Sequence, residues 1–169
     1  RIVYSLTGYQ PQRISTHAIE YQLRNASYIR ALTYDQEGHK NYCMETDSGT
    51  FCFDHATGAW HQRQSAGMDW WRVHGACRAY GKTLLLDRAS GKIYTPDLDS
   101  FTENGETISF DIYLPTIEPS RDRRKMYSFE LVCETGVGNA AAADPQAMLR
   151  YSDDGGHLWS DEMWRTLGA

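Results

Sequence analysis

The sequence predicts an all-β fold of short antiparallel strands with one short N-terminal helix. From residue 28 onward, segments in which apolar and polar residues alternate are separated by Gly, Asp, Asn and Ser. This is the pattern of half-buried strands joined by turns. Aromatic residues, which favour strands, make up 12% of the chain. One segment near the N-terminus has the spacing of an amphipathic helix.

The helical segment is PQRISTHAIEYQLRNAS, residues 11–27. Ser15 or Thr16 is a suitable N-cap, because its hydroxyl can accept a hydrogen bond from an amide of the first turn. Asn25 is expected to end the helix. The spacing places three residues on the face that we expect to be buried, namely Ile14, Ala18 and Tyr21.

The predicted strands fall into three sets. The first set comprises residues 28–39, 40–48, 50–58 and 59–64. The second set comprises residues 72–81, 82–91 and 92–98. The third set comprises residues 106–117, 125–136, 147–156 and 157–160. Short connections with turn residues, such as Glu37-Gly38, indicate that neighbouring strands pair antiparallel.

Two of the four cysteines lie at matching positions of one predicted hairpin. A turn at Asp47 and Ser48 sets Cys43 opposite Cys52, close enough for a disulfide. The same register pairs the neighbouring residues, Met44 with Phe51 and Tyr42 with Phe53. We expect free thiols, because small buried cysteines are common in cytosolic folds. No CxxC pair and no His at zinc-finger spacing is present, so no metal site is predicted.

The pattern Asp-x-Ala-Thr/Ser-Gly occurs twice, as DHATG at residues 54–58 and as DRASG at residues 87–91. In each copy the Asp can accept hydrogen bonds from amides of the turn, and the Gly can supply a positive φ. An apolar segment precedes each copy, and an aromatic residue follows it. The residues assigned to these structural turns are Asp54, Gly58, Trp60, Asp87 and Gly91.

Repeated hairpins at this spacing are typical of the blades of a β-propeller. We therefore expect a propeller-like fold, with residues 1–27 as a helical lead-in and residues 28–169 as a partial set of blades. A β-sandwich is the alternative, since it is also built from short antiparallel strands.

The stretch YSDDGGHLWS, residues 151–160, places two carboxylates and a histidine in one short loop. It matches the Asp-box pattern Ser-x-Asp-x-Gly-x-x-Trp through Ser152, Asp154, Gly156 and Trp159. In this hairpin device the Asp accepts main-chain hydrogen bonds, the Gly takes a positive φ and the Trp lies between strands. Adjacent carboxylates diverge on a turn, whereas a glycosidase needs two that converge on one bond. We therefore predict a structural role and no catalytic residue.

The composition argues against several classes of function. A net charge of -5 does not suit a general nucleic-acid-binding surface, which must neutralise phosphates. The basic stretch RDRRK, residues 121–125, is expected to be a solvated loop. No apolar run is long enough to span a bilayer. No cofactor is predicted.

Four segments of the sequence, taken together and in order, are more specific than the Asp-box pattern alone. They are GYQPQRISTHAIEYQL, YDQEGHKNYCM, FDHATGAWHQR and DPQAMLRYSDDGGHLWSDEMW. Together they resemble the packaged-DNA stabilization proteins of tailed bacteriophages and prophages, which are tail accessory or head-closure factors. The resemblance runs from about residue 8 to the C-terminus, and it departs at Leu158, where an Asp-box more often has Thr or Ser. Family members are longer and this chain begins without Met, so we expect a prophage-encoded fragment.

The resemblance implies a structural virion protein without catalysis. Such a protein would form a homo-oligomeric ring below the portal, seal the channel and retain packaged DNA by plugging the exit. The implied partners are phage structural proteins (the portal, the tail hub and tail fibre or spike proteins), with no sequence-specific nucleic acid and no membrane. The implied location is the virion tail, and the host cytoplasm during assembly.

The alternative function is a sialidase-like, glycan-processing enzyme or a glycan-binding module, because Asp-boxes occur in sialidases. This alternative predicts a deep pocket that holds several arginines near a tyrosine and a glutamate.

Overall fold

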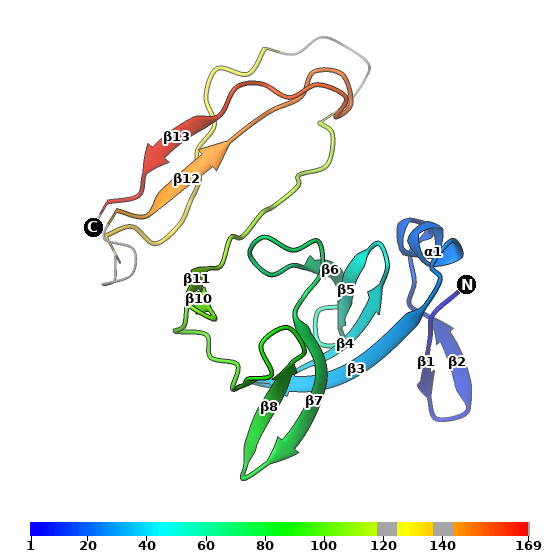
Figure 1. Cartoon of the computed structure of the whole chain (residues 1–169). Helices are drawn as coiled ribbons and strands as arrows, with labels where there is room; N and C mark the ends of the chain where they lie inside the picture. The colour runs from blue at the N-terminus through cyan, green and yellow to red at the C-terminus, as the bar shows by residue number, and fades with distance from the viewer. Residues whose placement is uncertain (118–124, 137–143, 169) are drawn as a thin grey trace. The chain divides into compact units, whose positions relative to one another are not determined.

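The computed structural model describes residues 1–117, 125–136 and 144–168. The basic stretch at residues 121–125 lies outside these residues except for Lys125. The described residues form one short helix and several small antiparallel sheets, so the predicted all-β class is confirmed (Figure 1). The chain divides into two compact units, Arg1–Ser109 and Phe110–Ala169.

The first unit begins with a hairpin that the sequence analysis does not predict. Its strands are β1 (Tyr4–Thr7) and β2 (Gln10–Arg13). The helix α1 (His17–Arg24) follows, with Thr16 as N-cap and Asn25 as C-cap. The Thr16 hydroxyl accepts a hydrogen bond from the amide of Ile19 at 3.4 Å. Both predicted ends of the helix are therefore confirmed.

The predicted buried face of α1 is wrong. Ile19 and Leu23 are buried, whereas Ala18 is exposed and Tyr21 is 63% exposed. Ile19 and Leu23 are four residues apart, and they pack with Met44 and Phe51 of the neighbouring sheet. This pair is the larger apolar surface that the helix can offer, which explains why it is the buried one.

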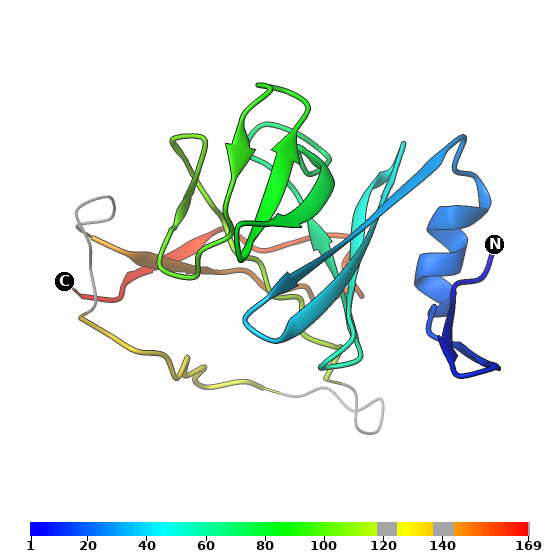
Figure 2. The same cartoon turned by 90° about the horizontal axis from the view of Figure 1, so that it is seen from below.

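The first sheet is an antiparallel meander of four strands in chain order. Its strands are β3 (Ile29–Gln36), β4 (His39–Thr46), β5 (Gly49–Asp54) and β6 (Ala59–Arg63). The predicted register between β4 and β5 is confirmed: Cys43 lies opposite Cys52, with Met44 opposite Phe51 and Tyr42 opposite Phe53. Figure 2 shows α1 beside this sheet, on the face that carries Met44 and Phe51.

A second, three-stranded meander covers the other face of the first sheet. Its strands are β7 (Val73–Ala79), β8 (Lys82–Asp87) and β9 (Ile93–Tyr94). The core between the two sheets contains Tyr34, Cys43, Cys52, Trp71, Val73 and Leu85. Successive residues of a strand point to opposite faces, so a sheet covered on both sides buries both sets. This accounts for β5, in which every residue is buried.

A small hairpin ends the first unit, and a longer one lies in the second unit. The first consists of β10 (Thr102–Glu103) and β11 (Glu106–Thr107). The second consists of β12 (Gln146–Leu149) and β13 (Met163–Thr166). The loop between β12 and β13 contains residues 151–160.

Most of the third predicted set of strands is wrong. Within the described residues, 108–117 and 125–136 form no strand. The strand predicted at 147–156 ends at Leu149, and residues 157–160 form no strand. A strand exists only when its backbone groups find a hydrogen-bonded partner, and alternation of apolar residues does not supply that partner.

Candidate functional site

The first repeated turn is held together by the carboxylate of Asp54. The amide of Ala56 donates to Asp54 Oδ1 at 2.9 Å, and the Thr57 hydroxyl donates to Oδ2 at 2.8 Å. The amide of Gly58, whose φ is 71°, donates to the Asp54 carbonyl at 2.9 Å. Trp60 then returns to the sheet, where its ring centroid lies 5.2 Å from that of Phe53.

The second repeated turn uses Asp87 in the same way. The amide of Ala89 donates to Asp87 Oδ1 at 2.7 Å, and the Ser90 hydroxyl donates to Oδ2. The amide of Gly91 donates to the Asp87 carbonyl at 3.0 Å. The Tyr94 hydroxyl adds a hydrogen bond to Asp87 Oδ2 at 3.2 Å. Both copies of the pattern therefore form the same turn at the end of the penultimate strand of a meander.

Each turn carboxylate also has a distant partner that the sequence analysis does not identify. His39 Nδ1 lies 2.8 Å from Asp54 Oδ2, and Arg72 Nε lies 3.3 Å from Asp87 Oδ2. The Asp87 side chain is fully buried, whereas the His39 side chain is half exposed. The two turns thus share local geometry but differ in the distant side chain that contacts the carboxylate.

The His39 contact has a consequence for acid stability. Hydrogen bonds from His39, Thr57 and the Ala56 amide lower the pKa of Asp54 from 3.8 to about 2. A carboxylate whose pKa is lowered by folding stabilises the fold above its ordinary pKa. That stabilisation is lost as the pH falls from about 4 to about 2.

We therefore expect Asp54→Asn to reduce the loss of stability that the protein undergoes at acidic pH. Between about pH 4 and pH 2, the melting temperature of the variant should fall less steeply than that of the wild type. Circular dichroism melts across this pH range measure both slopes. Asp35→Asn, which changes an exposed carboxylate on β3, is the matched control and should keep the wild-type slope. Equal slopes for the wild type and Asp54→Asn would contradict the assignment.

The loop at residues 151–160 is organised by Ser152 and Asp154. The amides of His157 and Leu158 donate to Asp154 Oδ1 at 2.9 and 2.8 Å, and the Ser152 hydroxyl donates to the same oxygen at 2.8 Å. The Gly156 amide donates to the Ser152 hydroxyl at 2.8 Å, and Gly156 has a φ of 94°. Hydrogen bonds from the Leu158 amide and the Ser152 hydroxyl lower the pKa of Asp154.

Trp159 does not lie buried between strands, which corrects the expectation for this residue. It is 47% exposed, and its ring centroid lies 6.4 Å from that of Tyr113. The guanidinium of Arg150 lies 5.9 Å from the same ring. The reason is that β12 ends at Leu149 and β13 begins at Met163, so the loop extends beyond the paired strands.

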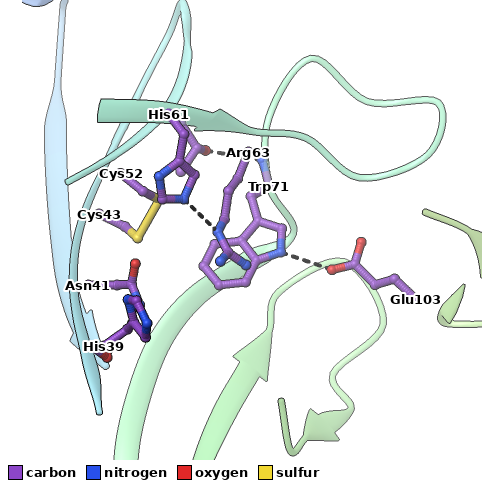
Figure 3. The surroundings of a disulfide bond; sticks show 9 residues. His39, Asn41, Cys43, Cys52, His61, Arg63, Trp71 and Glu103 are labelled. Carbon is purple, nitrogen blue, oxygen red and sulfur yellow. Dashed lines mark hydrogen bonds between the residues drawn. A yellow bond between two sulfur atoms is a disulfide. The ribbon is translucent and has the colours of Figure 1, made fainter. Parts of the chain in front are cut away.

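Cys43 and Cys52 form a disulfide, so the expectation of free thiols is wrong (Figure 3). Their Cα atoms are 4.0 Å apart, because the two residues are directly opposite on β4 and β5. Both side chains point to the face that packs on the second sheet, where they are 1% and 0% exposed. The register predicted from the turn placed the two cysteines opposite each other correctly. The expectation of free thiols, based on the frequency of buried cysteines in cytosolic folds, gave the wrong redox state.

A cluster of rings and charges lies beside the disulfide (Figure 3). The guanidinium of Arg63 lies 4.9 Å from the Trp71 ring centroid and 5.4 Å from that of Tyr34. Arg63 Nε donates to His61 Nε2 at 3.3 Å, and Trp71 Nε1 donates to Glu103 at 2.9 Å. These residues come from separate segments of the chain, so no local motif identifies them.

A second missed cluster is centred on Glu45, whose side chain is 2% exposed. Arg88 forms an ion pair with Glu45 Oε1, and the Tyr28 hydroxyl donates to the same oxygen at 3.1 Å. The guanidinium of Arg88 lies 3.9 Å from the Trp70 ring centroid. Glu45 belongs to β4 and Arg88 follows β8, so the pair links the two stacked sheets.

The first unit contains cavities beside its loops. One, of about 280 Å³, lies between residues 64–69 and the β10–β11 hairpin, and another, of about 300 Å³, lies beside the C-terminal end of α1. Among the described residues, no arginine lines either cavity. The described part of the chain also holds no group of three or more His, Cys, Asp or Glu arranged to bind a metal.

The predicted site residues belong to two turns of the first unit and to one loop of the second unit. Asp54, Gly58, Trp60, Asp87 and Gly91 lie in two separate turns of the first unit, whereas Ser152, Asp154, Gly156 and Trp159 lie in the second unit. Each of the three carboxylates accepts hydrogen bonds from its own turn. Within the described ranges, no helix is long and apolar enough to cross a membrane.

No model of a known protein family matches this sequence, and no curated protein matches it.

Proposed function

We propose that this chain is a structural component of a phage tail or head-closure assembly, without catalysis. The observation that supports a structural role most directly is that the three carboxylates at the predicted sites accept hydrogen bonds within their own turns. Asp54, Asp87 and Asp154 each accept hydrogen bonds from amides and hydroxyls of their own turns. A catalytic acid or base needs a free position that faces its substrate. The virion assignment itself rests on the resemblance of the four ordered segments.

We further propose that the two stacked meanders are successive blades of a propeller-like scaffold. The first sheet has the four antiparallel strands of a blade, and the second packs on its face. The repeated turn joins β5 to β6 in the first sheet and β8 to β9 in the second, which are equivalent positions if the second blade lacks its first strand. The helix α1 covers the face on which a preceding blade would pack.

The glycan-processing alternative has less support. A sialidase-like site requires several arginines that converge on a carboxylate of the substrate, near a tyrosine and a glutamate. Among the described residues, neither cavity has an arginine in its wall. Arg63, Arg72 and Arg88 are each engaged with an aromatic ring or a carboxylate of the chain itself.

The proposed function is tested by assembly and by turnover in parallel. The protein is mixed with the portal protein of the same phage or prophage and, as a control, with the portal of an unrelated phage. Size-exclusion chromatography with light scattering should show a stable complex with the cognate portal alone, and a fluorogenic sialoside should not be hydrolysed. Turnover of the sialoside without portal binding would overturn the proposal.

A further inference from the structure

The disulfide between Cys43 and Cys52 lies beneath the second, three-stranded meander. The two cysteines are 1% and 0% exposed, and they share one packed cluster with Trp71, Val73 and Leu85. Val73 and Leu85 belong to β7 and β8, and Trp71 precedes β7 and lies beside the disulfide in Figure 3. A thiolate breaks a disulfide only by direct attack on one of its sulfur atoms. The packed fold therefore keeps a reductant away from this bond.

The first sheet itself encloses the disulfide on its other sides. Cys43 and Cys52 lie on β4 and β5, the two central strands of the sheet. His61 of β6 lies opposite Cys52 and beside the disulfide (Figure 3). The other face of the sheet carries Met44 and Phe51, which pack against α1. Displacement of the second meander would therefore expose the sulfur atoms while the strands of the first sheet remain paired.

The second meander is less deeply buried than the sheet that it covers. Only Val73 is buried on β7, and only Leu85 and Asp87 are buried on β8, whereas every residue of β5 is buried. The register of β7 against β8 is also interrupted between Val73 and Gly75. Segments with few buried contacts open at a lower free energy than the centre of a core. We therefore expect the second meander to open before the first sheet unfolds.

We propose that the second meander is a gate that controls reduction of the Cys43–Cys52 disulfide by small thiols such as glutathione. When the gate opens, a glutathione thiolate attacks one sulfur, forms a mixed disulfide and releases the other cysteine as a thiolate. A second glutathione then displaces the remaining protein sulfur and leaves as glutathione disulfide. The two glutathione molecules supply the two electrons and two protons that convert the bond into two thiols. This inference rests on burial and sheet topology, and it does not depend on the proposed virion function.

The test compares two leucine-to-alanine variants on opposite faces of the first sheet. Leu85→Ala weakens the contact between the second meander and the disulfide, whereas Leu23→Ala weakens the docking of α1 on the other face. Both variants lose the same side-chain atoms from a packed cluster, so both lower the stability of the fold. Only Leu85→Ala weakens the gate, which makes Leu23→Ala the matched control.

The rate of reduction is measured on the folded protein. The exposed thiols of Cys77 and Cys133 are first blocked with iodoacetamide, and the protein is then incubated with excess glutathione. Maleimide labelling and mass spectrometry at successive times count the thiols that reduction releases. We expect reduction of Leu85→Ala to be at least ~10-fold faster than that of the wild type, and reduction of Leu23→Ala to be no more than ~3-fold faster. Urea denaturation gives the stability of each variant for comparison.

Each alternative outcome has a separate meaning. Equal acceleration by the two variants would mean that reduction follows unfolding of the whole unit, and it would overturn the inference. Reduction of the folded wild type as fast as in concentrated urea would show that the second meander protects nothing. Free thiols at Cys43 and Cys52 before any reductant is added would remove the bond that the gate controls. If Leu85→Ala does not fold, Leu85→Val takes its place, with an acceleration of at least ~3-fold expected and an unchanged rate overturning the inference.

Discussion

Arg72→Met should lower the free energy of unfolding by about 3–5 kcal/mol, because it leaves the carboxylate of Asp87 buried without its cation. The Asp87 side chain is fully buried, and the Arg72 side chain is 9% exposed. Burial acts to raise the pKa of Asp87, but hydrogen bonds from Ser90 and Ala89, together with the charge of Arg72, lower that pKa overall. Asp87 therefore stays charged in the fold, and the variant must bury that charge without its nearest cation.

Arg78→Met is the matched control for this prediction. Arg78 lies on β7 and is exposed, so the same replacement should change the free energy of unfolding by no more than ~0.5 kcal/mol. Urea denaturation followed by tryptophan fluorescence measures both variants. The double variant Arg72→Met/Asp87→Asn should be more stable than Arg72→Met alone, since it removes the unpaired charge. Unfolding of Arg72→Met at the wild-type urea concentration would show that the ion pair carries no stability.

The hairpins of the first unit were predictable because their determinants are local. A two-residue turn at Asp47-Ser48 fixes the register of β4 and β5, and a shift by one residue would exchange the two faces of each strand. The same applies to the repeated turns, where Asp54 and Asp87 bond to groups within four residues. The dipeptide Asn104-Gly105, between β10 and β11, is an equally local hairpin signal.

The features that escaped prediction depend on partners far along the chain. His39 and Arg72 reach the turn carboxylates only because the sheets bring them there. Glu45 and Arg88 meet only because the second meander packs on the first. Residues 108–117 have the alternation of a strand, but among the described residues only Ile108 forms a backbone hydrogen bond, from its amide to the Phe101 carbonyl at 3.0 Å. A sequence pattern alone does not reveal whether a strand has a partner.

The helix shows how tertiary packing overrides a choice between two acceptable faces. Two sets of apolar residues have helical spacing. One set is Ile14, Ala18 and Tyr21, and the other is Ile19 and Leu23, on the opposite side. The sheet surface decides between them, since Ile19 and Leu23 pack with Met44 and Phe51, and Leu23 is only 1% exposed. Trp60 reinforces this choice, because its Nε1 donates to the Ile14 carbonyl at 2.8 Å and fixes the entry to the helix.

Leu23→Ala should therefore lower the free energy of unfolding by about 2–5 kcal/mol, the range for removing a large aliphatic side chain from a packed core. Leu23 is 1% exposed, in the cluster with Ile19, Met44 and Phe51. A helix of eight residues is too short to be stable by itself, so α1 forms because it docks on the sheet. Loss of the Leu23 contact weakens the docking and the helix together.

Tyr21→Ala separates this interpretation from the one that the sequence favoured. Tyr21 is 63% exposed, so its truncation should cost no more than ~0.5 kcal/mol. Both variants are measured by urea denaturation with far-ultraviolet circular dichroism. If Tyr21→Ala were the more damaging of the two, the helix would have to pack through Ala18 and Tyr21, and the cluster with Met44 and Phe51 would have to be covered by another segment. The difference between the two variants thus decides which face of α1 joins the helix to the first sheet.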